Sequence, residues 1–239
     1  MRWALLVICL GSLAGVGSAA WAQGDDPSRF LDPADVPLTG EYPEMFQPDG
    51  WIIEAVVPGE LTGDQFPDMV VTLVEDLLPQ EGGIPVERYK ALVMLQGTES
   101  GYTLAGVGPR ALRCSTCYGM LGGPDGGWPE IEIQGNVVVI DDLFGSRDAQ
   151  NLVLKYRWDA DRQAFRLIGR DSNYTDRLTL ESTYESTNYL TGLTIIEHVT
   201  IDEQTEEEHT TTERIEGEPQ VILLQDVDND SLSMPLSMQ

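Results

Sequence analysis

The sequence predicts a mainly β protein, an antiparallel meander that forms a sandwich, a partial barrel or a blade-like stack. Three observations predict this fold class. Short runs rich in β-branched and aromatic residues recur along the chain, and turn residues separate them as hairpins require. No run of ten or more residues has a convincing 3.6-residue period, so an α/β fold is not expected.

The N-terminal 22 residues have the pattern of a signal peptide. An apolar stretch over 4–16 is followed by small residues that end at Ala22, and the stretch is short for a bilayer core of about 30 Å. We therefore expect cleavage after Ala22, a periplasmic or secreted product, and no membrane insertion after cleavage. Residues 23–48 are rich in Asp, Pro and Gly and predict a flexible leader, with order beginning near Trp51.

A β domain is predicted over residues 49–200. Its clearest hairpin joins 152–158 to 164–168 through Asp159-Ala160-Asp161-Arg162, because alternation on both arms puts one face into a core. Further turn signals are Glu99-Ser100-Gly101 and Gln134-Gly135-Asn136. The expected strands are 51–57, 69–74, 89–95, 102–107, 131–133, 136–140, 152–158, 164–168, 178–184 and 193–200.

The segment 201–239 has a different composition. It begins with a run of acids and a run of threonines, and mutual repulsion of the acids predicts a mobile or edge segment. Apolar residues return over 221–224, where we expect a late strand.

The charge of the chain excludes several classes of partner. Asp and Glu number 40 against 14 Lys and Arg, which gives a formal net charge of −26. Nucleic acid and anionic membrane surfaces are therefore repelled. Cations are the natural ligands, although scattered acids also serve simply to keep an exported protein soluble.

The loop between the first two expected strands is a candidate metal site. The side chains of Glu60, Thr62, Asp64 and Asp68, with the carbonyl of Phe66, have a spacing that lets their oxygens converge on one hard cation. Calcium takes six to eight oxygen ligands, so calcium is the expected cofactor.

Residues 59–68 resemble the G-D-x-N-G-D-G-x-x-D calcium loop of FG-GAP or VCBS repeats. The resemblance implies a calcium-binding β-hairpin turn with the same five ligands. This sequence departs from the motif at three places, since Glu60 replaces Asp, Thr62 replaces Asn, and Gln65 replaces Gly. The alternative is a tight hairpin whose acids cap backbone N–H groups.

A broader resemblance covers about residues 48–195. The segments 48–51, 112–119, 165–169 and 186–192 look like those of a group of exported bacterial proteins of unknown function. This resemblance implies an exported β protein and no particular reaction.

Cys114 and Cys117 form a C-x-x-C motif. In an oxidising compartment we expect a disulfide between them that holds the glycine-rich loop beyond. A redox dithiol or half of a zinc site are alternatives. The first lacks a surrounding βαβ pattern, and the second would need further ligands, for which His198 and His209 lie in poor contexts.

Other residues have a structural and a functional interpretation. The acids over 226–231 resemble the start of a calcium loop but lack its Gly and closing Glu, so a solvated turn is expected. Asp141-Asp142 and Asp159-Ala160-Asp161 are interpreted first as hairpin turns. A set of aromatic residues is expected in the core, with a carbohydrate platform as the alternative: Trp51, Trp128, Tyr156, Trp158 and Phe165.

We find no nucleophile elbow and no convincing catalytic histidine in the sequence. The main hypothesis is therefore an exported, non-catalytic binding or structural module of the envelope or exterior, with a calcium-stabilised hairpin and a partner there. The alternatives are a hydrolase that uses paired carboxylates and, with less support, a C-x-x-C thiol oxidoreductase.

Overall fold

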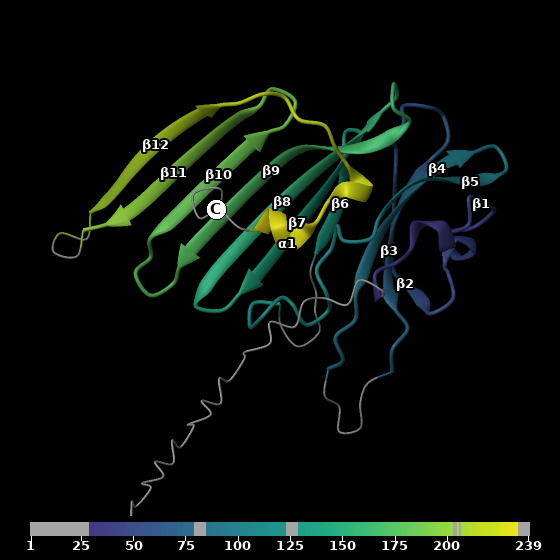
Figure 1. Cartoon of the computed structure of the whole chain (residues 1–239), viewed down its shortest axis with the longest axis horizontal. Helices are drawn as coiled ribbons and strands as arrows, with labels where there is room; N and C mark the ends of the chain where they lie inside the picture. The colour runs from purple at the N-terminus through teal and green to yellow at the C-terminus, as the bar shows by residue number, and fades with distance from the viewer. Residues whose placement is uncertain (1–28, 79–84, 123–128, 203–204, 206, 234–239) are drawn as a thin grey trace, which may run out of the picture.

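Two antiparallel β-sheets make up the fold, which confirms the mainly β prediction (Figure 1). The computed structural model describes residues 29–78, 85–122, 129–202, 205 and 207–233. The predicted signal peptide lies outside these residues. Within them, no helix combines the length and the apolar composition needed to cross a bilayer.

Five strands form the first sheet, in the order β1-β5-β4-β3-β2: β1 (Thr39–Gly40), β2 (Trp51–Gly59), β3 (Asp68–Glu75), β4 (Lys90–Thr98) and β5 (Gly101–Gly108). Every neighbouring pair is antiparallel. The predicted turn at Glu99-Ser100 joins β4 to β5, since Thr98 pairs with Gly101. The apolar runs of β3 and β4 are buried on both faces, so this sheet is the middle layer of the molecule.

The second sheet has eight strands: β6 (Glu130–Gln134), β7 (Val137–Gly145), β8 (Asp148–Asp159), β9 (Ala164–Asp176), β10 (Ser182–Asn188), β11 (Leu193–Ile201), β12 (Glu208–Glu216) and β13 (Ile222–Leu223). The strands from β6 to β12 follow one another in space as in sequence, and β13 pairs with β9. The predicted hairpin of β8 and β9 is present, with Asp159 opposite Ala164. Gly135 and Asn136 both have positive φ, as a two-residue turn between twisted strands requires.

The main core lies between the two sheets. Leu92 and Met94 of β4 pack in one apolar cluster with Ile140 of β7 and Leu154 of β8. Alternation along the strands makes one face of this sheet apolar. In β7, residues alternate strictly between buried and partly exposed. The face of the eight-stranded sheet that carries Ile140 and Leu154 is its inner face, and the opposite face is its outer face.

A second core covers the other face of the five-stranded sheet. The apolar side chains of Leu31, Val36 and Phe46 are buried there against Val71 and Val93. The short 3-10 helices η2 (Pro33–Asp35) and η3 (Pro43–Phe46) shape this segment.

The expectation that order begins near Trp51, after a flexible leader over 23–48, was therefore wrong from residue 29 onward. Isolated apolar residues have no periodicity in sequence, yet each one can fill a separate pocket on a neighbouring sheet.

The C-terminal segment extends the fold beyond the predicted 49–200 domain. Strand β12 is an edge strand with every residue exposed, as its acidic composition suggested. Strand β13 is the late strand expected over 221–224. The chain then forms η4 (Leu224–Asp226) and α1 (Asn229–Ser233), and α1 is drawn over the eight-stranded sheet in Figure 1.

Several predicted strand boundaries were wrong. Strands β7, β8 and β9 extend beyond the expected ranges 136–140, 152–158 and 164–168. The strand expected over 178–184 begins only at Ser182, because the preceding residues form a turn in which Leu180 N–H bonds to Asp176 O at 2.7 Å. Leu180 has a φ of 63°, and Leu178 is 75% exposed. The two leucines imitate a strand pattern without facing any core.

Candidate functional site

The predicted calcium loop connects β2 to β3, and Asp68 anchors it. The Asp68 side chain is fully buried, and its carboxylate accepts hydrogen bonds from the N–H groups of Leu61 at 2.7 Å, Thr62 at 2.9 Å and Gly97 at 2.8 Å. The Thr62 hydroxyl donates a fourth bond at 3.1 Å. Asp68, the first residue of β3, therefore fastens the loop to β3 and to β4.

Two other predicted ligands also bind backbone N–H groups. Glu60 Oε1 accepts a bond from Gly63 N–H at 2.7 Å, and Asp64 Oδ1 accepts one from Phe66 N–H at 2.7 Å. The bond from Phe66 lowers the pKa of the Asp64 carboxyl, and the amide of Gln96, 3.2 Å from Asp64 Oδ2, adds to this effect. These contacts match the alternative interpretation, in which the acids cap the hairpin.

This conformation of the loop does not fit a calcium ion. Calcium requires several oxygens around one point. Both oxygens of Asp68 already accept bonds from protein donors, while Glu60 and Asp64 each close a separate small turn. Calcium at Glu60, Thr62, Asp64, Phe66 and Asp68 stays a prediction, and its binding would need a different arrangement of the loop.

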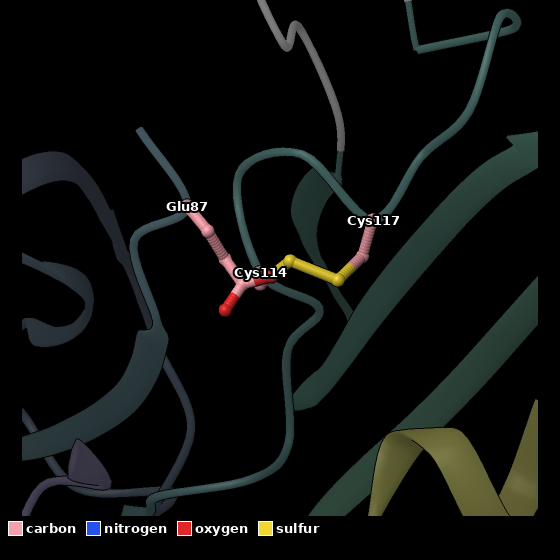
Figure 2. A group of neighbouring side chains, drawn as sticks. All are labelled: Glu87, Cys114 and Cys117. Carbon is pink, nitrogen blue, oxygen red and sulfur yellow. A yellow bond between two sulfur atoms is a disulfide. The ribbon is translucent and has the colours of Figure 1, made fainter. Parts of the chain in front are cut away.

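Glu87, Cys114 and Cys117 form another group of metal-ligand type (Figure 2). Within the described part of the chain, it is the one set of three or more His, Cys, Asp or Glu residues whose ligand atoms all lie within 4.8 Å of one another. The two sulfur atoms are bonded to each other, however, so neither is a thiolate. While the disulfide is intact, this group does not fit a metal.

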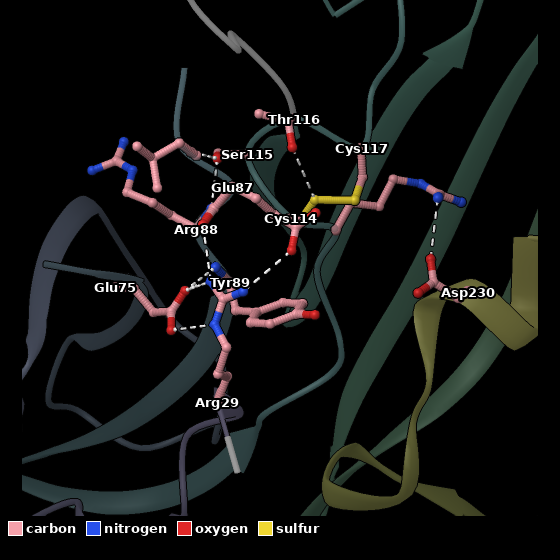
Figure 3. The surroundings of a disulfide bond; sticks show 12 residues. Arg29, Glu75, Glu87, Arg88, Tyr89, Cys114, Ser115, Thr116, Cys117 and Asp230 are labelled. Atoms are coloured by element: carbon pink, nitrogen blue, oxygen red, sulfur yellow. Dashed lines mark hydrogen bonds and ion pairs between the residues drawn. A yellow bond between two sulfur atoms is a disulfide. The ribbon is translucent and has the colours of Figure 1, made fainter. Parts of the chain in front are cut away.

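Cys114 and Cys117 form a disulfide, as the C-x-x-C motif predicted. The disulfide lies in an irregular segment after β5 (Figure 3). Ser115, inside the disulfide loop, accepts a hydrogen bond from Arg88 N–H at 3.0 Å and donates one to Val86 O at 3.1 Å. The bridge therefore pins this loop to the chain just before β4. Among the described residues no helix begins at the motif, whereas redox-active C-x-x-C motifs usually stand at a helix N-terminus.

Beside the disulfide, Arg29 joins the N-terminal segment to the five-stranded sheet. Its guanidinium forms an ion pair with Glu75 at 2.6 Å and a longer one with Glu87 at 3.3 Å, and it lies 4.4 Å from the ring centre of Tyr89 (Figure 3). The Phe30 ring packs on the same tyrosine. The surroundings of the disulfide are thus a packed structural corner.

The predicted core aromatics are in the core. Trp51, Tyr156 and Phe165 are buried, and Trp158 packs on Phe165 with 5.2 Å between ring centres. Trp128 lies outside the described residues. The described members of this set leave no aromatic platform on the surface.

The acidic runs form caps and turns. Asp228 accepts a hydrogen bond from Asp230 N–H at 3.1 Å at the start of α1, and it pairs with Arg110 at 2.9 Å. Asp159 accepts bonds from Asp161 N–H at 3.2 Å and Arg162 N–H at 3.3 Å in the β8–β9 turn. The turn interpretation is therefore confirmed for Asp159-Ala160-Asp161. It was wrong for Asp141-Asp142, which lie inside β7, where strand pairing continues to Gly145. It was also wrong for 226–231, which end η4 and begin α1, with Asn229 buried.

A buried ionic cluster, absent from the sequence-based predictions, joins α1 to the core. Arg113 lies between Asp142 and Asp230, each 3.2 Å from a guanidinium nitrogen, and it also donates to the Ser233 hydroxyl. Its guanidinium stacks 3.5 Å from the ring centre of Phe144. The contact with Asp142 is an ion pair without hydrogen-bond geometry, since Arg113 Nε and Asp142 Oδ1 have no hydrogen-bond partner in the described part of the chain.

Burial raises the pKa of Asp142 to about 6, against the opposing effects of Arg113 and of the Asn229 side chain. Burial likewise raises the pKa of Tyr118, whose hydroxyl has no hydrogen-bond partner within the described residues. Asp142 is on the inner face of β7 and is 1% exposed, so this carboxylate is closed to ligands.

The outer face of the eight-stranded sheet carries an open groove of about 420 Å³ across β8 to β11. Strand register places Asn151, Asn173, Tyr184 and Glu197 in one row across these four strands. Each comes from a position that points away from the core, where a strand of this sheet carries polar residues. We call this feature the outer groove.

Sequence reasoning missed the outer groove because its residues come from four separate strands. One signal was available. Along β10 the exposed Tyr184 and Ser186 alternate with the buried Glu185 and Thr187, so an aromatic residue stands among polar ones on a solvent face. Only the pairing of the strands could place that tyrosine beside Asn173 and Glu197.

No protein-family model, curated protein or solved structure matches the chain. The resemblance to FG-GAP loops and to exported proteins of unknown function therefore stays a prediction from the sequence. The outer groove has to be interpreted from its own chemistry.

Proposed function

We propose that the chain is an exported, non-catalytic β-sandwich module that binds a ligand in the outer groove. The observation that carries this proposal is the groove itself, because 420 Å³ falls within the volume range of small-molecule sites. Tyr184 supplies an exposed ring there, and its hydroxyl has no hydrogen-bond partner among the described residues. A rigid sheet that presents unsatisfied polar groups is suited to recognition.

Two features support a periplasmic or secreted location for this module. The Cys114–Cys117 disulfide is typical of oxidising compartments. The pattern of residues 1–22 is that of a signal peptide. A partner or ligand in the envelope or exterior follows from this location.

Binding is favoured over hydrolysis by the surroundings of the carboxylates. A hydrolase needs a carboxyl group with a raised pKa at the ligand site, so that it can donate a proton near neutral pH. Asp142, whose pKa is raised, lies on the inner face, whereas the outer groove has Asp171 in an ion pair with Lys155 at 2.6 Å. These two acids cannot act on one ligand.

The proposal is tested with soluble neutral oligosaccharides, polyamines and short cationic peptides. Each class is added to the wild type, to Tyr184→Ala and to Tyr42→Ala, whose exposed tyrosine lies in the N-terminal segment, and thermal unfolding is followed. We expect one class to raise the midpoint of the wild type and of Tyr42→Ala but not of Tyr184→Ala. Equal responses of all three proteins would refute the outer groove as the site.

Catalysis is tested separately. The mature protein is incubated with the oligosaccharides and the products are separated by chromatography. We expect no cleavage. Turnover that disappears in Glu197→Gln would replace the binding module with a carboxylate-dependent hydrolase.

A further inference from the structure

The floor of the outer groove is held by charged side chains that already have partners. Lys155 Nζ lies 2.6 Å from Asp171 Oδ2, and the Ser186 hydroxyl donates to Asp171 Oδ1 at 2.6 Å. The carboxylate of Asp171 is thus neutralised by Lys155 and fixed by Ser186. On the neighbouring strand, the Asn151 amide donates to Asp141. This part of the groove is polar and ordered in advance, with the charge of Asp171 balanced by Lys155.

Three side chains of the groove keep polar groups free. Tyr184 is 44% exposed, and neither its hydroxyl nor the carboxylate of Glu197 has a partner among the described residues. Asn173 accepts a bond from the Thr175 hydroxyl at 3.4 Å, while its N–H groups have no partner in the same part of the chain. The free groups therefore comprise one amide donor, one carboxylate acceptor and one hydroxyl that both donates and accepts.

An apolar surface lies beside these polar groups. The ring of Tyr184 stands on the same sheet face as Ile195, because Tyr184 pairs with Glu197 and Ser186 pairs with Ile195. Ile195 also lines the groove. The groove thus combines a patch of exposed ring and aliphatic carbon with donors and acceptors at its sides.

We propose that the ligand of the outer groove is a neutral oligosaccharide, an inference that rests on the function proposed above. A sugar ring has an apolar C–H face that packs on a tyrosine ring, and hydroxyls around its edge that donate to a carboxylate and accept from an amide. Both halves of this chemistry are present within one open groove of about 420 Å³.

Charge selects a neutral ligand over the other classes. Glu197 and a formal net charge of −26 repel anionic ligands. A cationic ligand would find Asp171 already paired with Lys155, which leaves Glu197 as the unpaired carboxylate among the named residues of the groove. Hydroxyl groups satisfy the amide, the carboxylate and the tyrosine hydroxyl without an ion pair.

The test uses isothermal titration calorimetry with neutral glucan, mannan and chitin oligosaccharides. The proteins are the wild type, Tyr184→Ala, Tyr184→Phe and the control Tyr42→Ala. We expect at least one sugar series to bind the wild type, Tyr42→Ala and Tyr184→Phe, because Phe keeps the stacking ring. Loss of that ring in Tyr184→Ala should weaken binding by roughly tenfold or more. Urea unfolding of each variant verifies that the fold is intact.

Ionic strength provides a second readout. A neutral sugar should bind with the same affinity at low and high salt, since no ion pair forms with it. A polyamine is titrated in parallel. Its binding should be weak and should fall as salt is added.

The outcomes separate the two proposals. If a polyamine or peptide binds in a Tyr184-dependent manner and no neutral sugar does, the saccharide inference is wrong and the outer groove remains a ligand site. If a sugar binds equally well to Tyr184→Ala, its site is elsewhere and the inference is overturned. If nothing that binds depends on Tyr184, both proposals fail.

Discussion

At the scale of single residues, Asp68 and Asp142 are both buried carboxylates with opposite surroundings. Asp68 receives hydrogen bonds from three N–H groups and a hydroxyl, so its charge is satisfied by neutral donors. Asp142 is buried beside Arg113 with one oxygen unpartnered among the described residues, and burial raises its pKa against the effect of that guanidinium. The Asp68 carboxylate should stabilise the folded state, whereas the ionised Asp142 carboxylate should destabilise it near neutral pH.

Asp68→Ala should lower the free energy of unfolding by about 3 kcal/mol, because it leaves several buried N–H groups without an acceptor. Urea denaturation measures this loss. The matched control is Asp64→Ala in the same loop, whose exposed carboxylate should matter far less. Similar losses in the two variants would contradict the role of Asp68 as the anchor.

Asp142 should make a pH-dependent contribution to stability. Its pKa is about 6 in the folded protein and lies near 3.9 in the unfolded chain, so the folded state binds the proton more tightly. The contribution to the free energy of unfolding is therefore small above pH 6 and increases as the pH falls. Between pH 7 and pH 4 the increase should be about 2 kcal/mol.

Asp142→Asn is the control for this dependence, since its side chain does not titrate. Urea denaturation of both proteins from pH 7 to pH 4 gives their difference in stability, which removes the titration of every other acid. The free energy of unfolding of the wild type should increase relative to that of Asp142→Asn as the pH falls. A difference that stays constant over this range would show that the Asp142 pKa is not raised.

At the scale of elements, short cross-links hold irregular segments against the sheets. The disulfide and Ser115 fix the loop after β5, and Arg113 fixes α1 beside β7 through Asp230 and Ser233. Both segments lack the ladder of backbone hydrogen bonds that holds a strand. Their positions therefore depend on a few side chains.

Replacing Cys114 and Cys117 together with serine should reduce the free energy of unfolding by about 2 kcal/mol, because the bridge closes only a short loop. Thermal or urea unfolding measures the loss. Hydrogen exchange should increase at residues 86–88, which the disulfide loop contacts. A variant that unfolds like the wild type would show that the bridge is not structural.

At the scale of the whole molecule, the outer face of the eight-stranded sheet points away from the core between the sheets and carries the outer groove. β10, β11 and β12 continue the eight-stranded sheet on the side away from the five-stranded sheet (Figure 1). Self-repulsion of a net charge of −26 opposes the compact state, and added salt should relieve it. Such general stabilisation has to be separated from binding of a particular cation.

Calcium and magnesium at equal concentration should raise the thermal midpoint by equal amounts, because the acids of residues 60–68 are engaged with N–H groups. A specific calcium site would distinguish the two ions through its ligand number and cavity size. Thermal unfolding of the wild type and of Asp64→Ala provides the measurement. A larger rise with calcium that is lost in Asp64→Ala would restore the metal site implied by the FG-GAP resemblance.

The sequence by itself determined the β class, most strands, several hairpin turns and the disulfide. These features depend on neighbours in the chain: alternation in the β8–β9 hairpin, Gly135 and Asn136 in their turn, and two cysteines three residues apart. The predictions that were wrong judged a segment by its own residue pattern, whereas its structure depends on whether a distant part of the fold packs against it. Leu178 and Leu180 looked like a strand, and the isolated apolar residues before Trp51 looked unstructured.

Only the tertiary structure decided what each candidate site residue contacts. Asp68 and Asp64 look alike in the loop sequence, yet one is buried by the fold and the other is exposed. The row of the outer groove, from Asn151 to Glu197, exists only once four strands pair in one register. The burial of a side chain, and the approach of side chains from different strands to one site, depend on contacts between distant parts of the chain. Composition and local spacing do not specify those contacts.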